Sequence, residues 1–405
     1  MCADFRFHPV GHGLFYSGVI NLQAVSGNPF TFVYDCGGAG IEERIKEFWN
    51  PHHGGRLDLL VVSHFHWDHI KGVPNLIKAS KPRVIVLPYL YPEEIDVNVS
   101  ALSSMAESDF DVANFEDVKR FISSPAEFCN EHCGDGRCRI YFVHSDRDAG
   151  AASEHDDRQN TDMTGDGLKF PLDVTGTGER GVYHIGNGAV GSITGWRFRF
   201  FMPKTASFFD KFKKCLCQLG IKGDWLESSS CLDGVFAKIQ EAFRAYNQKK
   251  NPNISNLVCV HWPYVVNGNR CAWVAWAGGG LGECQRCYCP MLYCGFDGRK
   301  ANAQVLTGDA MFDCGMQVEI EKSYKDRCFL FQIPHHGSRN GWRDWFNELP
   351  SCKLRPVTHR WNCTYNGKPF MTDRKNLMDA CHITESSMSA LNVRMFAWDG
   401  AGDEL

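Results

Sequence analysis

The sequence has no apolar run that approaches the ~20 residues needed to cross a membrane as a helix. Its opening residues, MCADFRFHPV, lack a basic segment followed by an apolar stretch, so we expect no signal peptide. Lys and Arg (43) nearly balance Asp and Glu (47), which leaves a net charge of -4. Proteins that coat nucleic acid are usually basic, so that class is disfavoured. We therefore expect a cytoplasmic protein that does not act on a membrane.

The number of cysteines is odd, 19, which excludes a fully paired disulfide framework. Without an export signal we expect thiols or metal ligands instead. Two clusters have spacings that zinc could use: Cys284, Cys287, Cys289 and Cys294 in the loop 280–296, and Cys129, Cys133 and Cys138 around His132. In the first cluster the two pairs of cysteines lie closer together in sequence than in ordinary zinc ribbons. A structural zinc at the first cluster is therefore the alternative, and free thiols are the favoured interpretation of both.

Apolar runs that predict buried strands alternate with segments of helical spacing. TFVYD (31–35), LDLLVVS (57–63) and PRVIVLP (82–88) have the strand pattern, and IEERIKEFW (41–49) has the helical one. Such alternation predicts an α/β layered protein. Further along, WRFRFFMP (196–203) alternates as a half-buried strand does, and helical spacing returns near 206–219 and 232–248.

The segment 92–190 differs in character, since it is rich in Ser, Asp, Gly and Asn. We predict one domain spanning residues 1–405, with 92–190 as an insertion that contains a helix near 114–122 and a strand at 139–144. Long irregular segments in compact domains are often functional, so the insertion is expected to shape substrate access.

The sharpest signal is His64-Phe65-His66-Trp67-Asp68-His69, directly after a predicted buried strand. Imidazole nitrogens and carboxylate oxygens are the natural ligands of zinc and other first-row divalent ions. On a tight loop His64 and His66 can point one way while Asp68 and His69 point another. One short segment can then supply ligands to two adjacent ions.

Two later strands end in residues of the same chemistry. QVLTGDA (304–310) ends in Gly308-Asp309, where the carboxylate could bridge two cations. FLFQIPHHGS (329–338) ends in His335 and His336, as a ligand and a neighbouring imidazole. Because functional groups in α/β layered folds collect at strand ends on one edge, the three clusters support each other.

This order of motifs resembles the metallo-β-lactamase-fold superfamily. HWDHIKG, LTGDA and PHHGS look like the hydrolase domain of bacterial competence, or DNA-uptake, channels and its soluble relatives. FHPVGHGLFYS is similar to the opening strand and turn of that branch, whose usual form is close to DVGQGD, and NISNLVCV to its segment before the Gly-Asp turn. The resemblance implies a four-layer αβ/βα sandwich, here with a long insertion.

The resemblance also implies roles for individual residues. His64 and His66 would bind the first ion, Asp68 and His69 the second, and Asp309 would bridge them. We assign His335 to the second ion and His336 to catalysis, although the sequence does not distinguish the two. The family usually takes one more first-site ligand from a middle strand, for which His144, His184 and His261 are candidates.

The expected cofactors are two divalent ions, zinc in the first place, with Mn or Fe as alternatives. Such a pair turns a bound water into hydroxide near neutral pH and stabilises the charge that develops on the substrate. Asp68 would orient this water or accept its proton, and His336, Ser338 or His359 would protonate the leaving group.

The favoured substrate is a phosphodiester, in a nucleic acid or a nucleotide-like molecule. An acyl or lactone hydrolase with the same metals is the first alternative. The second is a non-catalytic binding or regulatory protein with a vestigial metal site.

Overall fold

The computed structural model describes residues 1–21, 29–49, 57–90, 94–95, 98–99, 102, 112–134, 138–148, 175–176, 181–193, 195–202, 256–264, 270–278, 291–297, 302–310, 312, 314–338, 343–359, 380–384, 386 and 390–398. The helices expected near 206–219 and 232–248, and Cys284, Cys287 and Cys289, lie outside these residues.

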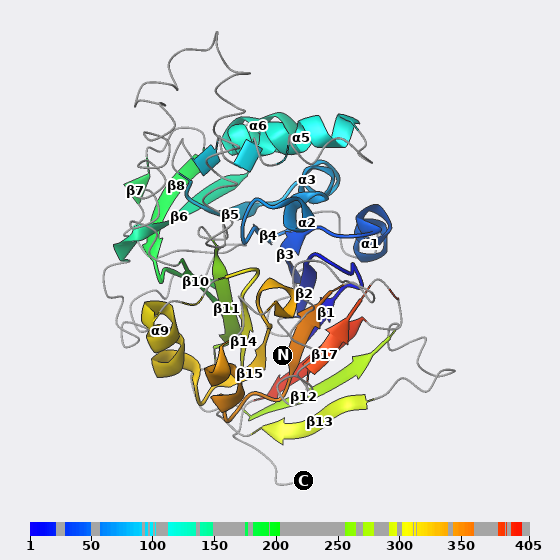
Figure 1. The fold of residues 1–405 in the computed structure, drawn as a ribbon, viewed down its shortest axis with the longest axis vertical. Helices are drawn as coiled ribbons and strands as arrows, with labels where there is room; N and C mark the ends of the chain where they lie inside the picture. Colours follow the sequence, from blue (N-terminus) through cyan, green and yellow to red (C-terminus); the bar gives the residue numbers. More distant parts are fainter. Residues whose placement is uncertain are drawn as a thin grey trace.

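The larger sheet has eleven described strands in the order β13-β12-β18-β1-β2-β3-β4-β5-β6-β8-β7 (Figure 1). Its middle, from β3 to β8, is parallel, whereas β13 to β3 pair antiparallel. The strands are β1 (Cys2–Phe7), β2 (Phe15–Asn21), β3 (Phe30–Cys36), β4 (Leu59–Val61), β5 (Val84–Pro88), β6 (Arg139–Asp148), β7 (Thr175–Gly176), β8 (Val182–Asn187), β12 (Arg270–Ala277), β13 (Met291–Asp297) and β18 (Leu391–Trp398).

The second sheet has the order β15-β14-β11-β10-β9, and a separate parallel pair joins β16 to β17. Its strands are β9 (Val190–Ile193), β10 (Trp196–Phe201), β11 (Val258–Pro263), β14 (Ala303–Leu306) and β15 (Cys328–Phe331), and the pair consists of β16 (Arg355–Thr358) and β17 (Ala380–Ile383). In β10 the tryptophan and phenylalanines are buried and the two arginines are partly exposed, which confirms the predicted alternation.

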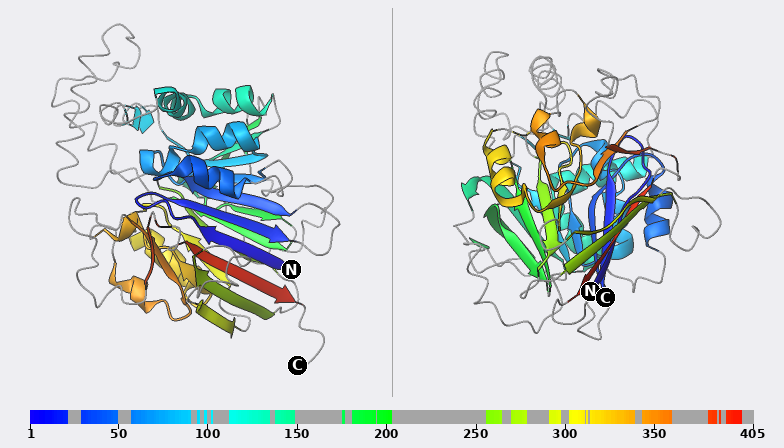
Figure 2. Two further views of the ribbon diagram at one scale, coloured as in Figure 1. Left: turned by 90° about the vertical axis from the view of Figure 1, so that its right-hand side faces the viewer. Right: turned by 90° about the horizontal axis from the view of Figure 1, so that it is seen from below.

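Three hydrophobic clusters define the layers. The first joins the facing sides of the two sheets, with Phe5 and Phe32 from one and Phe198 and Leu306 from the other. The second lies between the larger sheet and the helices α1 (Ile41–Phe48), α3 (Val73–Ser80), α5 (Val112–Ser123) and α6 (Pro125–Cys133). The third lies between the second sheet and α9 (Cys314–Tyr324) with the 3₁₀ turn η4 (Asp344–Glu348). The result is helix, sheet, sheet, helix, which confirms the expected αβ/βα sandwich (Figure 2).

Part of the segment expected to be an insertion belongs to the larger sheet. The expected strand at 139–144 is the start of β6, which pairs parallel with β5, and β8 pairs with β6 on its other side. The apolar run Ile140–Val143 explains this placement, because a strand between two neighbours is buried on both faces. The helix expected near 114–122 is α5, which packs on α3. The rest of 92–190 falls largely outside the described residues.

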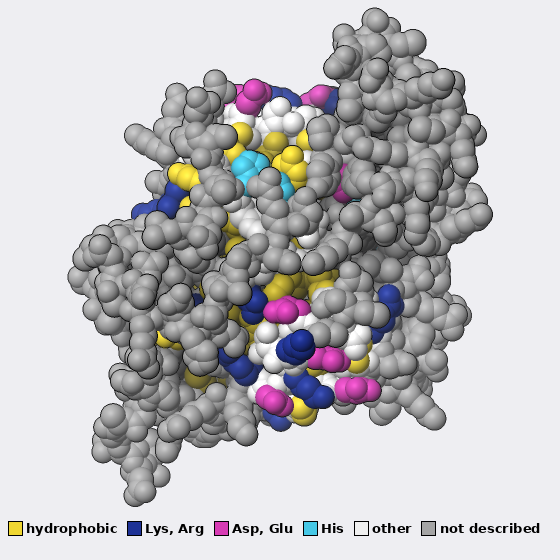
Figure 3. All heavy atoms as spheres, turned by 90° about the vertical axis from the view of Figure 1, so that its left-hand side faces the viewer, with side chains coloured by type: hydrophobic (Ala, Val, Ile, Leu, Met, Phe, Trp, Pro, Cys, Tyr) yellow, Lys and Arg dark blue, Asp and Glu magenta, His cyan; other side chains and the backbone are white. Residues whose placement is uncertain are grey.

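The outer surface near α9 carries charges of both signs side by side (Figure 3). Glu319, Glu321 and Lys322 lie on α9, and Lys325 directly follows its last residue. This face of the described chain therefore lacks the single-sign basic field that steers nucleic acids. Among the described helices, none combines the length and the apolar composition that a membrane span requires.

Candidate metal centre

Four segments from distant parts of the chain meet at the carboxyl ends of two parallel strand pairs, β3–β4 and β14–β15. They are the turn between β1 and β2, the loop after β4 with the short helix α2 (Trp67–Ile70), the turn after β14, and the 3₁₀ turn η3 (His335–Gly337) after β15. Backbone bonds join neighbouring segments: Leu14 N–H donates to Asp68 O (3.3 Å) and His335 N–H to Gly308 O (3.1 Å). These strand ends form the edge where the sequence predicted a site.

Two groups of ligand atoms form where the segments meet. One consists of His64, His69 and Asp309, and the other of His12, Asp68 and His336. Within each group the three ligand atoms lie within 4.8 Å of one another. The groups adjoin, since His336 Nε2 lies 3.5 Å from Asp309 Oδ1 and 3.1 Å from Asp68 Oδ2.

Asp35, buried at the end of β3, orients the first group. Its Oδ1 accepts the backbone N–H of Ser63 (2.6 Å), and its Oδ2 accepts Ser63 Oγ–H (2.6 Å) and His69 Nδ1–H (2.8 Å). Because Ser63 Oγ donates its proton to Asp35, it accepts from His64 Nδ1 at 2.9 Å. Both imidazoles therefore present an Nε2 lone pair or proton toward Asp309.

His336 is oriented by the last residue of β16, in the separate strand pair. Its Nδ1 lies 3.0 Å from the carbonyl oxygen of Thr358 at the end of β16, so Nδ1–H donates there and Nε2 points at Asp68. His335 and His336 both have a φ of 52°, a left-handed conformation that is costly for residues other than glycine. This strained turn directs the two adjacent imidazoles into one cluster.

A backbone hydrogen bond and the glycine turn before it fix the position of Asp309. Its N–H donates to Asn256 Oδ1 at 3.2 Å, and Gly308 before it has a φ of 53°. A Cβ at Gly308 would lie 2.6 Å from Ser63 Oγ. Glycine therefore permits the close approach of the Asp309 turn to the His64 loop.

The carboxylates and imidazoles shift one another strongly. Burial alone would raise the pKa of Asp309, but the imidazoles of His336, His69 and His335 hold that pKa well below its usual value. Burial opposes the charged form of His69, yet Asp309 and Asp68 raise its pKa well above the usual value. Burial lowers the pKa of His64, which keeps this imidazole neutral. The two carboxylates thus require positive charge beside them, which a proton or a cation supplies.

The first group has two buried nitrogen atoms that a cation would satisfy. The Nε2 atoms of His64 and His69 are buried and make no hydrogen bond within the described residues. They lie 3.8 Å and 3.3 Å from the oxygens of Asp309. A buried polar atom without a partner is costly, and imidazole nitrogens beside a carboxylate are a ligand set that divalent ions such as zinc take. The residues present therefore fit a divalent ion.

The remaining expected ligands lie at the edge of these groups. The His66 ring packs 4.6 Å from that of His64, but His66 belongs to neither group. His335 Nε2 lies 4.0 Å from Asp309 Oδ2, farther than His336, so the geometry favours His336 over His335 as a ligand. His69 was expected to share an ion with Asp68, but it lies nearer to Asp309. Which ligand serves which ion stays a prediction.

The candidates for a further first-site ligand lie elsewhere. His261 is fully buried between the sheets, where its Nε2 bonds the Tyr16 hydroxyl (3.0 Å) and aromatic rings surround it. His144 and His184 bond each other (2.8 Å), and neither belongs to the two groups.

The candidates for leaving-group protonation are also placed. His359 lies beside Thr358, and its Nε2 is 3.2 Å from His382 Nδ1. Ser338 follows η3 and donates its backbone N–H to His335 O (2.8 Å). The imidazole of the third candidate, His336, contacts both clustered carboxylates.

Among the described residues, the cysteines on and after α6 do not form a group of neighbouring ligand atoms with His132. Cys129, Cys133 and Cys138 are buried in the hydrophobic layer under the helices, and His132 packs on the Phe128 ring at 4.5 Å. Of the other cluster, only Cys294 falls within the described residues, on β13.

Sequence reasoning missed His12, Asp35 and Ser63. His12 stands in the turn VGHG, where the resembling motif DVGQGD has a glutamine, so a histidine there was a signal. Asp35 ends the run TFVYD, one residue before Gly37 and Gly38, and so shows the same pattern of a carboxylate at a strand end that drew attention to Asp309. Ser63 gave no signal of its own.

A family model of the metallo-beta-lactamase superfamily matches residues 24–121. No curated protein matches the chain. The matched stretch includes Asp35 and the His64–His69 motif, whereas His12, Asp309 and His336 lie outside it. Because the superfamily consists mostly of hydrolytic metalloenzymes, the match and the clustered His and Asp ligands point to a metal-dependent hydrolase.

Proposed function

We propose that the protein is a metal-dependent phosphodiesterase that acts on a nucleic acid or a nucleotide-like molecule. The observation that carries the proposal is the pair of adjoining groups, His64–His69–Asp309 and Asp68–His336 with their neighbours, at one edge of the sandwich. His64, His66, His69, Asp68, Asp309 and the histidines of η3 would hold two divalent ions. Such ions lower the pKa of a water molecule and polarise a phosphoryl oxygen.

The chain's own groups divide the remaining work. Asp309 lies between His69 and His336, 3.3 Å and 3.5 Å from their Nε2 atoms, where it can serve both halves of the site. The Asp68 side chain is 26% exposed. Its Oδ2 can accept a proton from an attacking water. The Asp68 carboxyl can then return this proton to the leaving group, while His336 Nε2 stays directed at the same carboxyl.

The exposed rim favours a polar, anionic substrate. The buried members of the cluster are His64, His69 and Asp309, while His12, Asp68 and His335 are 40%, 26% and 23% exposed. Imidazole N–H groups on the open side can donate hydrogen bonds to phosphoryl oxygens. An ester or lactam pocket would instead present apolar walls. The resemblance to the competence-channel hydrolases supports the same bond.

The test is a screen of the purified protein supplemented with Zn²⁺ or Mn²⁺, using bis-p-nitrophenyl phosphate, single-stranded DNA and a lactone side by side. We expect metal-dependent turnover of the phosphodiesters, lost on chelation and restored by metal. Asp309→Ala serves as the inactive reference. Turnover of the lactone alone would support the acyl-hydrolase alternative, and absence of bound metal would support a binding or regulatory protein.

A further inference from the structure

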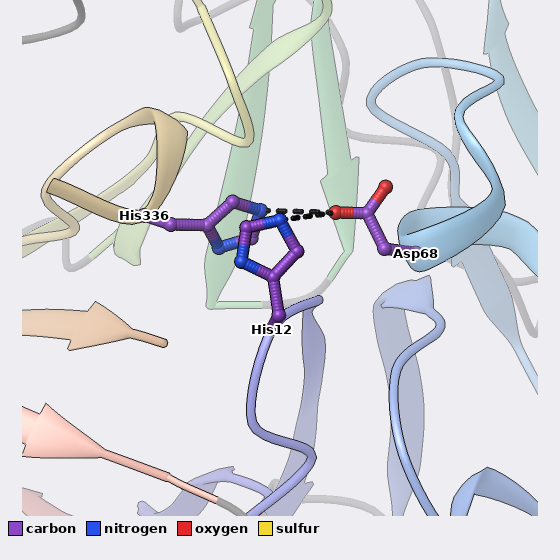
Figure 4. A group of neighbouring side chains, drawn as sticks. All are labelled: His12, Asp68 and His336. Carbon is purple, nitrogen blue, oxygen red and sulfur yellow. Dashed lines mark hydrogen bonds and ion pairs between the residues drawn. The ribbon is translucent and has the colours of Figure 1, made fainter. Parts of the chain in front are cut away.

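We propose that His12, in the turn between β1 and β2, is a direct ligand of the cation held by Asp68 and His336. The inference rests on the proposed metal-dependent function and adds a ligand from the N-terminal turn. Figure 4 shows the three side chains converging from three separate elements, with both imidazoles directed at the same carboxylate oxygen.

The backbone brings His12 to this place by unusually close contacts. Gly11 and Gly13 flank it with φ values of 66° and 140°, which favour glycine. A Cβ at Gly13 would lie 2.5 Å from Asp68 O and 2.7 Å from Gly38 Cα. The turn therefore packs against the backbone of Asp68, and the His12 side chain faces the carboxylate of the same residue.

Backbone hydrogen bonds fix the same turn on both sides. Leu14 N–H donates to Asp68 O (3.3 Å), Gly37 N–H to Leu14 O (3.0 Å) and Ala39 N–H to Val10 O (2.8 Å). His12 thus sits on a rigid support rather than on a free loop, which a metal ligand requires.

The spacing of the atoms suits a shared ion. His12 Nε2 lies 3.4 Å and His336 Nε2 3.1 Å from Asp68 Oδ2. Ligand bonds of ~2.0–2.1 Å in a tetrahedral zinc site put neighbouring ligand atoms about 3.3 Å apart. The imidazole rings of His12 and His336 also contact each other, with centroids 4.0 Å apart and planes tilted by 36°. Two imidazoles beside one carboxylate form a His₂Asp set of the kind that catalytic zinc uses with an open position.

His12→Gln gives the first measurement, in the full-length protein. Since His12 is 40% exposed, the exchange removes little packing, and circular dichroism checks the fold. Competition titration with a chromophoric zinc chelator should find two sites in the wild type. In the variant, affinity at one site should fall at least ~10-fold, as losses around bound metals do.

His12→Cys gives the second measurement, which reports position rather than affinity. With Co²⁺ bound, a thiolate at residue 12 should add a sulfur-to-cobalt charge-transfer band to the wild-type spectrum. Glu116→Cys, on the exposed side of α5, is the matched control and should add none.

The outcomes separate the inference from the proposed function. A wild type that binds two ions and cleaves bis-p-nitrophenyl phosphate, with unchanged affinity in His12→Gln and no new band in His12→Cys, overturns the ligand role alone. A raised KM in His12→Gln at unchanged zinc affinity would do the same and make His12 a substrate contact. A wild type that binds no metal overturns both.

Discussion

His336 Nε2 lies 3.1 Å from Asp68 Oδ2, although 268 positions separate the two residues. The contact joins the turn after β15 in one sheet to α2, which follows β4 in the other. It closes the site across the two halves of the sandwich. Each half alone supplies an incomplete set of ligands, so the site depends on the assembled fold.

Replacing the shared carboxylate should abolish hydrolysis. Asp309→Ala removes the group that faces His69 and His336, and we expect kcat/KM for bis-p-nitrophenyl phosphate to fall at least ~10²–10³-fold. His69→Ala should have the same effect. The fold should persist in Asp309→Ala, because the bond to Asn256 Oδ1 comes from the backbone N–H of residue 309. Asp326→Ala, on the exposed surface after α9, is the control, and retained turnover in Asp309→Ala and His69→Ala would remove the mechanism.

Asp35 should act on metal affinity through the histidines it positions. Asp35→Asn loses a charged acceptor for Ser63 and His69, so both metal-facing imidazoles lose their fixed tautomer. We expect a 10–100-fold lower zinc affinity, as outer-shell changes typically cause. The matched control is Asp58→Asn, whose carboxylate accepts a backbone N–H at Thr31. Equal zinc affinities in the two variants would argue against a positioning role.

Gly13→Ala should destabilise the protein more than a glycine exchange without a clash. Gly188→Ala is the matched control, because its φ is 81° but a Cβ would meet nothing nearer than 3.5 Å. Both variants carry the cost of a left-handed residue, whereas Gly13→Ala also clashes with Asp68 O. Urea denaturation in chelator should give an extra loss of about 1–3 kcal/mol for Gly13→Ala. Indistinguishable midpoints would show that the turn can move away from Asp68.

His261 should make stability depend on pH. Burial lowers its pKa to about 3, against 6.5 in the unfolded chain, so the unfolded state binds more protons between these values. The stabilisation is complete above pH 6.5 and is lost as the pH falls toward 3, by at most about 1.4 kcal/mol per pH unit. His261→Phe should reduce the slope of the unfolding free energy against pH by at most the contribution of one bound proton. Tyr16 keeps its hydrogen bond to Gln304 (2.9 Å) in this variant. Parallel stability curves for the two proteins would contradict the assignment.

Residue patterns alone predicted the α/β layering and most of the chemical groups of the site, and the family resemblance implied the four-layer sandwich. The apolar runs LDLLVVS and PRVIVLP mark strands buried on both faces, because they are short and rich in β-branched residues. The motif His64–His69 is local, since four ligand-type side chains within six residues are close in any fold. Asp309 and the η3 histidines were found because strand ends in α/β folds meet at one edge.

Which of these groups face one another follows from the packing of the two sheets. The preference for His336 over His335 comes from a left-handed turn and from Thr358 on β16, neither of which a sequence pattern encodes. His12 joins Asp68 because glycines let two backbones approach within contact distance, a relationship between segments more than fifty residues apart. A side chain's direction depends on the backbone angles of its own residue and on the partners packed around it. These are fixed only when both sheets close on their shared core.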